Sequence, residues 1–128
     1  MSTVGNVDRL DELNDRCREF AIARDWLPFQ TPKNLSMALA GEVGELLAEL
    51  QWLTPEQSTT VMTDPGLGPR VRAEIGDVVI YLMRLTDTLG VDPIQAAHAK
   101  LDDSARRYTV EEYRGVARKA PPTNEAGA

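Results

Sequence analysis

Apolar residues recur at steps of three and four along the chain, the period of an amphipathic α-helix. Four stretches show this pattern: residues 7–24, 34–53, 69–89 and 92–107. Asn34 is a plausible cap for the second, while Asp92 and Pro93 fit the cap and first position of the fourth. No stretch alternates in the manner of a β-strand. The sequence therefore predicts an all-α fold.

Two segments interrupt the helical pattern. Residues 25–32 contain two prolines, which cannot supply backbone donors to a helical ladder, together with Trp26 and Phe29. Residues 54–68 are rich in proline, glycine, serine and threonine, so we expect a flexible connection with one helical turn after Thr54. Four helices of this length, joined in this way, form a small four-helix bundle.

The third helix carries apolar residues on several sides: Val71, Ile75, Val78, Val79, Ile80, Leu82, Met83 and Leu85. This helix carries more apolar surface than the three neighbouring helices of one subunit need to cover. We therefore expect a homo-oligomer, either a dimer or a tetramer.

The length and composition fit one domain. The chain has 128 residues, of which 42% are hydrophobic, and we expect residues 1–110 to form the domain and 111–128 a flexible C-terminal tail. No stretch reaches a membrane span, and the first residues lack the apolar segment of a secretory signal. A cytoplasmic protein with no membrane partner is expected.

The net charge narrows the class of partner. It is −6, with a sequence pI near 4.8, the wrong sign for a surface that follows a nucleic-acid polymer. Such a protein can still bind a phosphorylated small molecule if divalent cations lie between its carboxylates and the phosphates.

Two acidic pairs stand out in the most apolar helices. Glu42 and Glu45 are neighbours on one side of the second helix, and Glu74 and Asp77 repeat the spacing on the third. One such pair is commonly a solvated surface. Two pairs in apolar surroundings indicate a compensating positive charge, because like carboxylates repel more strongly when they lose water.

The side chains available as ligands narrow the choice of metal ion. Oxygen ligands alone suit Mg²⁺, or Mn²⁺ as a substitute, since the single histidine, His98, is on another helix and Cys17 is isolated. Magnesium recruits phosphate oxygens, so a di- or triphosphate is the expected guest.

At this point the chain resembles the all-α nucleoside triphosphate pyrophosphatases of the MazG type, in particular their dCTP-pyrophosphatase-like branch. The matching segments are residues 24–35, 41–46, 51–52, 74–82 and 100–108. The resemblance implies a helical dimer or tetramer that cleaves a nucleoside triphosphate between its α- and β-phosphates, giving a monophosphate and pyrophosphate.

The resemblance also assigns roles to residues. It implies that Glu42, Glu45, Glu74 and Asp77 hold magnesium, and that Glu42 or Glu45 orients or deprotonates the attacking water. The residues implied to bind the substrate are Trp26, Phe29, Gln30, Trp52 and Tyr81 around the base or sugar, and Lys100, Ser104 and Arg107 at the triphosphate. We also expect Arg84, three residues after Tyr81, to reach the same site.

Three positions depart from the usual pattern of the branch. Gln30 stands where the branch usually has histidine, Cys17 where some members have histidine, and Ser104 where asparagine is common. The base preference therefore stays open between dCTP or a modified dCTP, dUTP, and a purine triphosphate. A different class of explanation is a catalytically silent helical module for oligomerisation or regulation.

Overall fold

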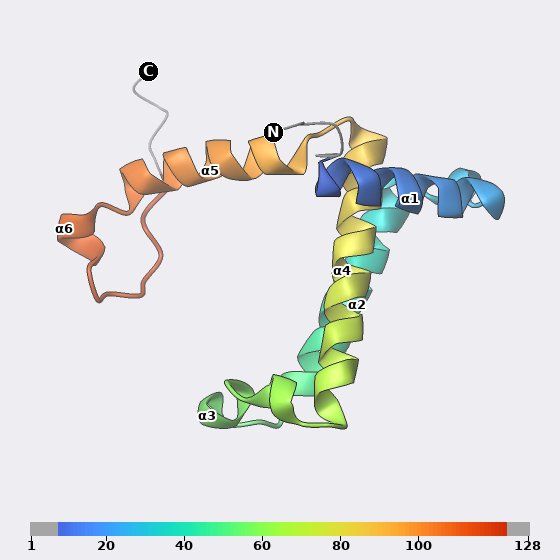
Figure 1. Cartoon of the computed structure of the whole chain (residues 1–128). Coiled ribbons are helices and arrows are strands. Elements are labelled where there is room, and N and C mark those ends of the chain that lie inside the picture. The colour runs from blue at the N-terminus through green and yellow to red at the C-terminus, as the bar shows by residue number, and fades with distance from the viewer. Residues whose placement is uncertain (1–7, 123–128) are drawn as a thin grey trace, which may run out of the picture. The chain divides into compact units, whose positions relative to one another are not determined.

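The computed structural model describes residues 8–122 and shows only helices and loops within that range, which confirms the all-α class (Figure 1). The long helices are α1 (Arg9–Ala23), α2 (Pro32–Leu50), α4 (Leu67–Leu89) and α5 (Pro93–Arg107). The short ones are η1 (Leu27–Phe29), α3 (Pro55–Ser58), η2 (Val61–Thr63) and α6 (Val110–Tyr113). The chain divides into two compact units, of which the first ends at Val91 and the second begins at Asp92.

Helix α2 begins two residues before the predicted cap. Thr31 has an extended backbone, and its hydroxyl accepts the backbone N–H of Asn34 at 3.2 Å. Pro32 occupies the first turn, where a missing N–H costs nothing. The prediction of Asn34 as the cap is therefore wrong. Its side-chain amide instead donates to the carbonyl of Phe29 at 2.9 Å, which ties the η1 loop to α2.

The helical turn after Thr54 is confirmed as α3. The Thr54 hydroxyl accepts the backbone N–H of Gln57 at 3.1 Å, and the Gln57 side chain accepts the backbone N–H of Thr54 at 2.9 Å, which together form a capping box. Gly68, in the first turn of α4, lies so close to η2 that an added Cβ would be 2.9 Å from the carbonyl oxygen of Met62. This close approach requires glycine.

In the first unit, α2 and α4 run antiparallel side by side and α1 lies across one end of the pair (Figure 1). The buried apolar side chains of this unit are Cys17, Ala21, Leu35, Val71 and Met83. Much of α4 stays uncovered, since Ile75, Val79 and Leu82 are each at least 37% exposed. Gly90, with a φ of 67°, ends α4 in the left-handed region that favours glycine.

An ionic network joins α1 to the last turns of α4. The Arg84 side chain is only 3% exposed, and its Nη1 lies 2.8 Å from Oδ2 of Asp87. Asp87 also accepts Nε of Arg18 at 3.0 Å, a second bond from Nη2 of Arg18, and Nδ2 of Asn14 at 3.2 Å. These donors hold the pKa of Asp87 well below its usual range.

The second unit contains α5 and α6. Asp92 caps α5 by accepting the backbone N–H groups of Ile94 and Gln95, as its sequence predicts. The Tyr108 hydroxyl accepts the backbone N–H of Ala120 at 3.0 Å. Part of the expected tail, residues 123–128, lies outside the described residues, and the domain boundary stays a prediction. Within residues 8–122, every helix is too short or too polar to cross a bilayer.

Removing the Asp87 carboxylate is expected to destabilise the first unit strongly. Asp87→Ala would leave the buried Arg84 guanidinium unpaired, and losing one partner of a buried pair costs about 3–5 kcal/mol. Asp15→Ala is the matched control, because Asp15 is 66% exposed and contacts Arg18 at 3.7 Å, so its loss should cost under about 1 kcal/mol. Urea denaturation measures both. Equal effects of the two substitutions would contradict the structural role of Asp87.

Candidate active site

The antiparallel packing of α2 and α4 brings the acidic pairs together. Glu42 and Glu45 project from α2 and Glu74 projects from α4, and each offers a carboxylate oxygen within 4.8 Å of the other two. We call these three side chains the carboxylate cluster. Three of the four acids that the spacing predicts on separate helices thus meet at one place.

Burial makes the carboxylate cluster costly for the protein. Glu42 and Glu74 are half-buried, and one oxygen of each, Oε2, is buried without a hydrogen-bond partner. Glu45 is exposed to solvent. Buried acceptors that lack a donor are uncommon and carry a desolvation penalty, so the chemistry of these oxygens suits a positively charged partner.

The raised pKa values of two of these carboxyls also indicate a site that suits a positive charge. Burial, with the hydrogen bond and charge of Glu45 and the charges of Asp77 and Glu74, raises the pKa of Glu42 to about 7. Burial and Glu45 also raise the pKa of Glu74. Among the ion pairs formed by residues 8–122, none involves these acids, so no lysine or arginine there offsets the repulsion.

Asp77 lies at the border between the carboxylate cluster and a cavity. It is half-buried one turn after Glu74, and its charge contributes to the raised pKa of Glu42. It does not join the three mutually close carboxylates, but it lines a cavity of about 460 Å³. A ligand in that cavity would therefore have one end next to the acids.

Two cavities converge on the η1 loop. The larger, of about 460 Å³, is lined by side chains from α1, the η1 loop and α4, among them Cys17, Trp26, Gln30, Asp77, Tyr81 and Arg84. The smaller, of about 280 Å³, includes Phe29 and shares Trp26, Gln30 and Tyr81 with the larger. Four residues predicted to surround the base thus lie together, close to Asp77.

A known protein family matches the part of the chain that contains these acids. The MazG-like family profile matches residues 38–121, which contain both acidic pairs. This chain belongs to the MazG-like family. The family resemblance seen in its motifs is confirmed.

Individual relatives show how far the likeness extends. The MazG-like chain is 39% identical over 110 residues to dCTP pyrophosphatase 1 of Bos taurus, and 40% identical over 114 residues to dCTP pyrophosphatase 1 of Homo sapiens. Each match covers 86% of this chain and 65% of the relative, so the chain spans slightly under two thirds of these curated relatives.

A solved structure shares the fold. A pyrophosphatase from Archaeoglobus fulgidus is 36% identical and superposes with a TM-score of 0.75, and the match covers 80% of this chain and 94% of that one. The all-α arrangement of the MazG-like chain is therefore that of a known pyrophosphatase structure.

Four of the predicted substrate contacts are not brought to the carboxylate cluster within the first unit. Trp52 follows α2, is 86% exposed, and lines neither of the two cavities. Lys100, Ser104 and Arg107 lie on α5 in the second unit. There Lys100 and Arg107 contact Asp103 at 3.6 and 3.7 Å.

Arg84 lines the larger cavity and forms hydrogen bonds that its sequence context does not predict. Besides the bond to Asp87, its Nε donates to Oε1 of Gln30 at 2.8 Å across 54 residues of chain. The spacing of Tyr81, Arg84 and Asp87 on one side of α4 is the only sequence signal that points to it.

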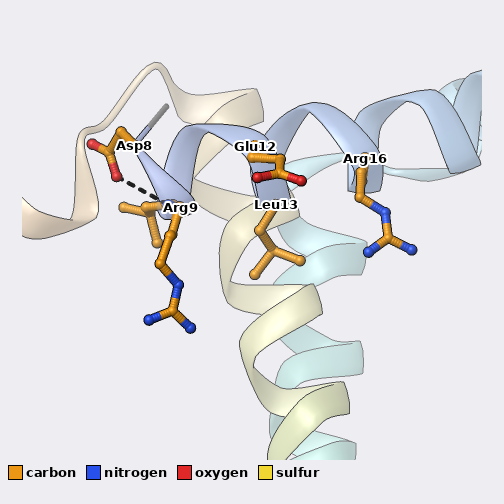
Figure 2. A pocket seen from close by; sticks show the side chains of 6 residues that line it. Asp8, Arg9, Glu12, Leu13 and Arg16 are labelled. Atoms are coloured by element: carbon orange, nitrogen blue, oxygen red, sulfur yellow. Dashed lines mark hydrogen bonds between the residues drawn. The ribbon is translucent and has the colours of Figure 1, made fainter. Parts of the chain in front are cut away.

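A further hollow of about 570 Å³ follows α1 and is lined by that helix and its cap alone. Figure 2 shows Arg9 and Arg16 extending from one side of α1 with Leu13 between them. Arg16 also lines the larger cavity and so supplies a positive charge at its border. None of the predicted site residues lies in this hollow.

Glu42 is expected to titrate near pH 7 in protein freed of divalent ions. Its folded-state pKa lies above the ordinary value of 4.5, so the stability from this carboxyl is fully present below pH 4.5 and is lost as pH rises through about 7. Glu42→Gln keeps the shape without the charge and should remove this loss. Urea denaturation across that pH range measures it, and the same pH slope in both proteins would contradict the shift.

Proposed function

We propose that this MazG-like protein hydrolyses the α–β phosphate bond of a nucleoside triphosphate, releasing a monophosphate and pyrophosphate with Mg²⁺ or Mn²⁺ as cofactor. The observation that carries the proposal is the carboxylate cluster, in which two half-buried glutamates each keep a buried oxygen without a partner. The proposed substrate is dCTP or a modified dCTP, and the proposed role is sanitation of the cytoplasmic nucleotide pool.

The carboxylate cluster fits a divalent cation by its chemistry. Glu42, Glu45 and Glu74 supply oxygens within 4.8 Å of one another. Asp77, one turn after Glu74 on α4, is the proposed fourth ligand. Oxygen ligands of this kind suit magnesium and manganese. The bound ions would acidify water and offset charge on the phosphates during in-line displacement.

The residues of the chain divide the remaining work. Either Glu42 or Glu45 would orient the attacking water and accept its proton. Glu45 is the more exposed of the two and so the more accessible to water. Trp26, Phe29 and Tyr81 hold the base by stacking, which is worth about 1–3 kcal/mol per base and places it without selecting it. Trp52, Lys100, Ser104 and Arg107 remain proposed contacts to the substrate.

Self-association belongs to the same proposal. The apolar side chains of α2 and α4 left uncovered in one copy include Val43, Leu47, Ile75, Val79 and Leu82. A stripe of this size on neighbouring helices is typical of an oligomer interface. A homodimer or homotetramer would cover it, and a second copy would also give the exposed Trp52 a partner surface.

Relatives bearing the name dCTP pyrophosphatase 1, and a related pyrophosphatase structure, support hydrolysis over a silent helical module. A silent module has no use for half-buried carboxylates that lack a positive partner. The same hydrolysis acting on dUTP or a purine triphosphate is the competing substrate assignment.

A panel of nucleoside triphosphates with magnesium tests the reaction. Monophosphate and pyrophosphate should appear in equal amounts, fastest with dCTP, and chelation of divalent ions should stop the reaction. Diphosphate plus orthophosphate would exclude α–β cleavage. No turnover of any triphosphate, with no thermal stabilisation by magnesium plus dCTP, would favour the silent module.

Substitution of the acids tests their roles. Glu45→Ala and Asp77→Ala should each lower kcat/KM by at least about 100-fold, because each removes a charged group from a site that must hold cations against phosphates. Glu56→Ala, at an exposed glutamate on α3, is the matched control and should leave kcat/KM unchanged. Full activity of Glu45→Ala or Asp77→Ala would remove that residue from the ligand set.

A further inference from the structure

Arg84 and Gln30 meet at the edge of the larger cavity. The Arg84 side chain is buried, and its Nε donates to Oε1 of Gln30 at 2.8 Å. Gln30 ends the η1 loop, is half-buried, and lines both cavities together with Trp26 and Tyr81. The Gln30 amide therefore lies beside the aromatic side chains that would stack on a base.

The Arg84 guanidinium is itself fixed in place. Its Nη1 donates to Asp87 at 2.8 Å, and Asp87 is held in turn by Arg18 and Asn14 from α1. Moving the guanidinium would unpair a buried charge, which is strongly unfavourable. The position of Arg84 is thus set by the fold and does not depend on a ligand.

A fixed guanidinium determines which way the Gln30 amide faces. A guanidinium only donates hydrogen bonds, so the amide must turn its oxygen, Oε1, toward Arg84. The nitrogen, Nε2, is then directed away from Arg84, and none of the hydrogen bonds formed among residues 8–122 uses it. The two N–H groups of Nε2 remain available to a ligand.

We propose that Arg84 is a positioning residue that holds the Gln30 amide with its nitrogen toward the base, so that the site selects cytosine over uracil and thymine. This inference rests on the proposed function and names the residues that would select its base. Gln30 is the specificity-determining contact, and Arg84, anchored by Asp87, prevents the amide from reversing.

The selection follows from the pyrimidine ring atom N3. In cytosine, N3 carries a lone pair and accepts a hydrogen bond, whereas in uracil and thymine N3 carries a hydrogen and donates one. An unrestrained glutamine amide could rotate by half a turn and present its oxygen to N3–H. Here that rotation would set Nε2 of Gln30 against Nε of Arg84, donor facing donor, and leave buried groups unsatisfied.

Gln30→Glu tests the contact with little change in shape. The carboxylate still accepts from Arg84 and presents an oxygen where Nε2 stood, so it should accept N3–H of uracil. We expect the ratio of kcat/KM for dCTP to that for dUTP to fall at least about tenfold, which corresponds to about 1.4 kcal/mol. Both substrates are assayed on one protein sample, so partial unfolding does not move the ratio.

Arg84→Met tests the positioning role. It frees the amide to rotate, so the preference for dCTP should fall toward equal use of dCTP and dUTP, while Asp87 keeps Arg18 and Asn14 as partners. Arg72→Met is the matched control, an exposed arginine on the same helix, and should keep the wild-type ratio. The melting temperature of each variant shows that the compared proteins are folded.

The outcomes separate the two proposals. A wild type that hydrolyses dCTP and dUTP, with a ratio that neither Gln30→Glu nor Arg84→Met changes, overturns the selectivity inference and leaves the proposed function standing. A wild type that hydrolyses no nucleoside triphosphate overturns the proposed function and the inference with it. A fall in the ratio for both variants, and not for Arg72→Met, supports the inference.

Discussion

Repulsion between carboxylates at the contact of α2 and α4 is the constraint on which the rest of the site depends. Glu42, Glu45 and Glu74 lie within 4.8 Å of one another at their oxygens, and no lysine or arginine among the described residues pairs with them. A fold that only needed stability would place apolar side chains at such a contact. The chain instead holds negative charge where it costs stability. In the proposed function, a divalent cation and the phosphates that it would recruit are the partners that make this arrangement favourable.

Helix α4 carries two opposite electrostatic environments about three and a half turns apart. Near Glu74 acids are in excess, and the pKa of that carboxyl is raised. Near Asp87 two guanidinium groups share one carboxylate, whose pKa is lowered. Tyr81 and the two cavities lie between these ends. In the account proposed above, the acidic end performs the phosphate chemistry and the end that contains Arg84 reads the base, so one helix sets the distance between the two.

Much of this organisation can be predicted from the sequence, because it depends on spacing within helices. The acidic pairs, the Asp92 cap, the turn after Thr54 and the family membership all follow from residues close together in the chain. The start of α2 differs from the prediction because proline opposes a helix interior but suits a first turn. Thr31 therefore caps the helix, and Asn34 does not. The bond between Arg84 and Gln30 joins residues 54 apart, and no local pattern encodes such a contact.

Binding of a divalent cation by the carboxylate cluster is the step on which the proposed reaction depends. Anomalous diffraction from crystals grown with Mn²⁺, collected at the manganese absorption edge, tests it without any assay of turnover. We expect an anomalous peak in contact with carboxylate oxygens of Glu42, Glu45 and Glu74, and loss of that peak in Glu74→Gln crystals prepared in the same way. Manganese bound elsewhere on the chain, with no peak among these three glutamates, would contradict it.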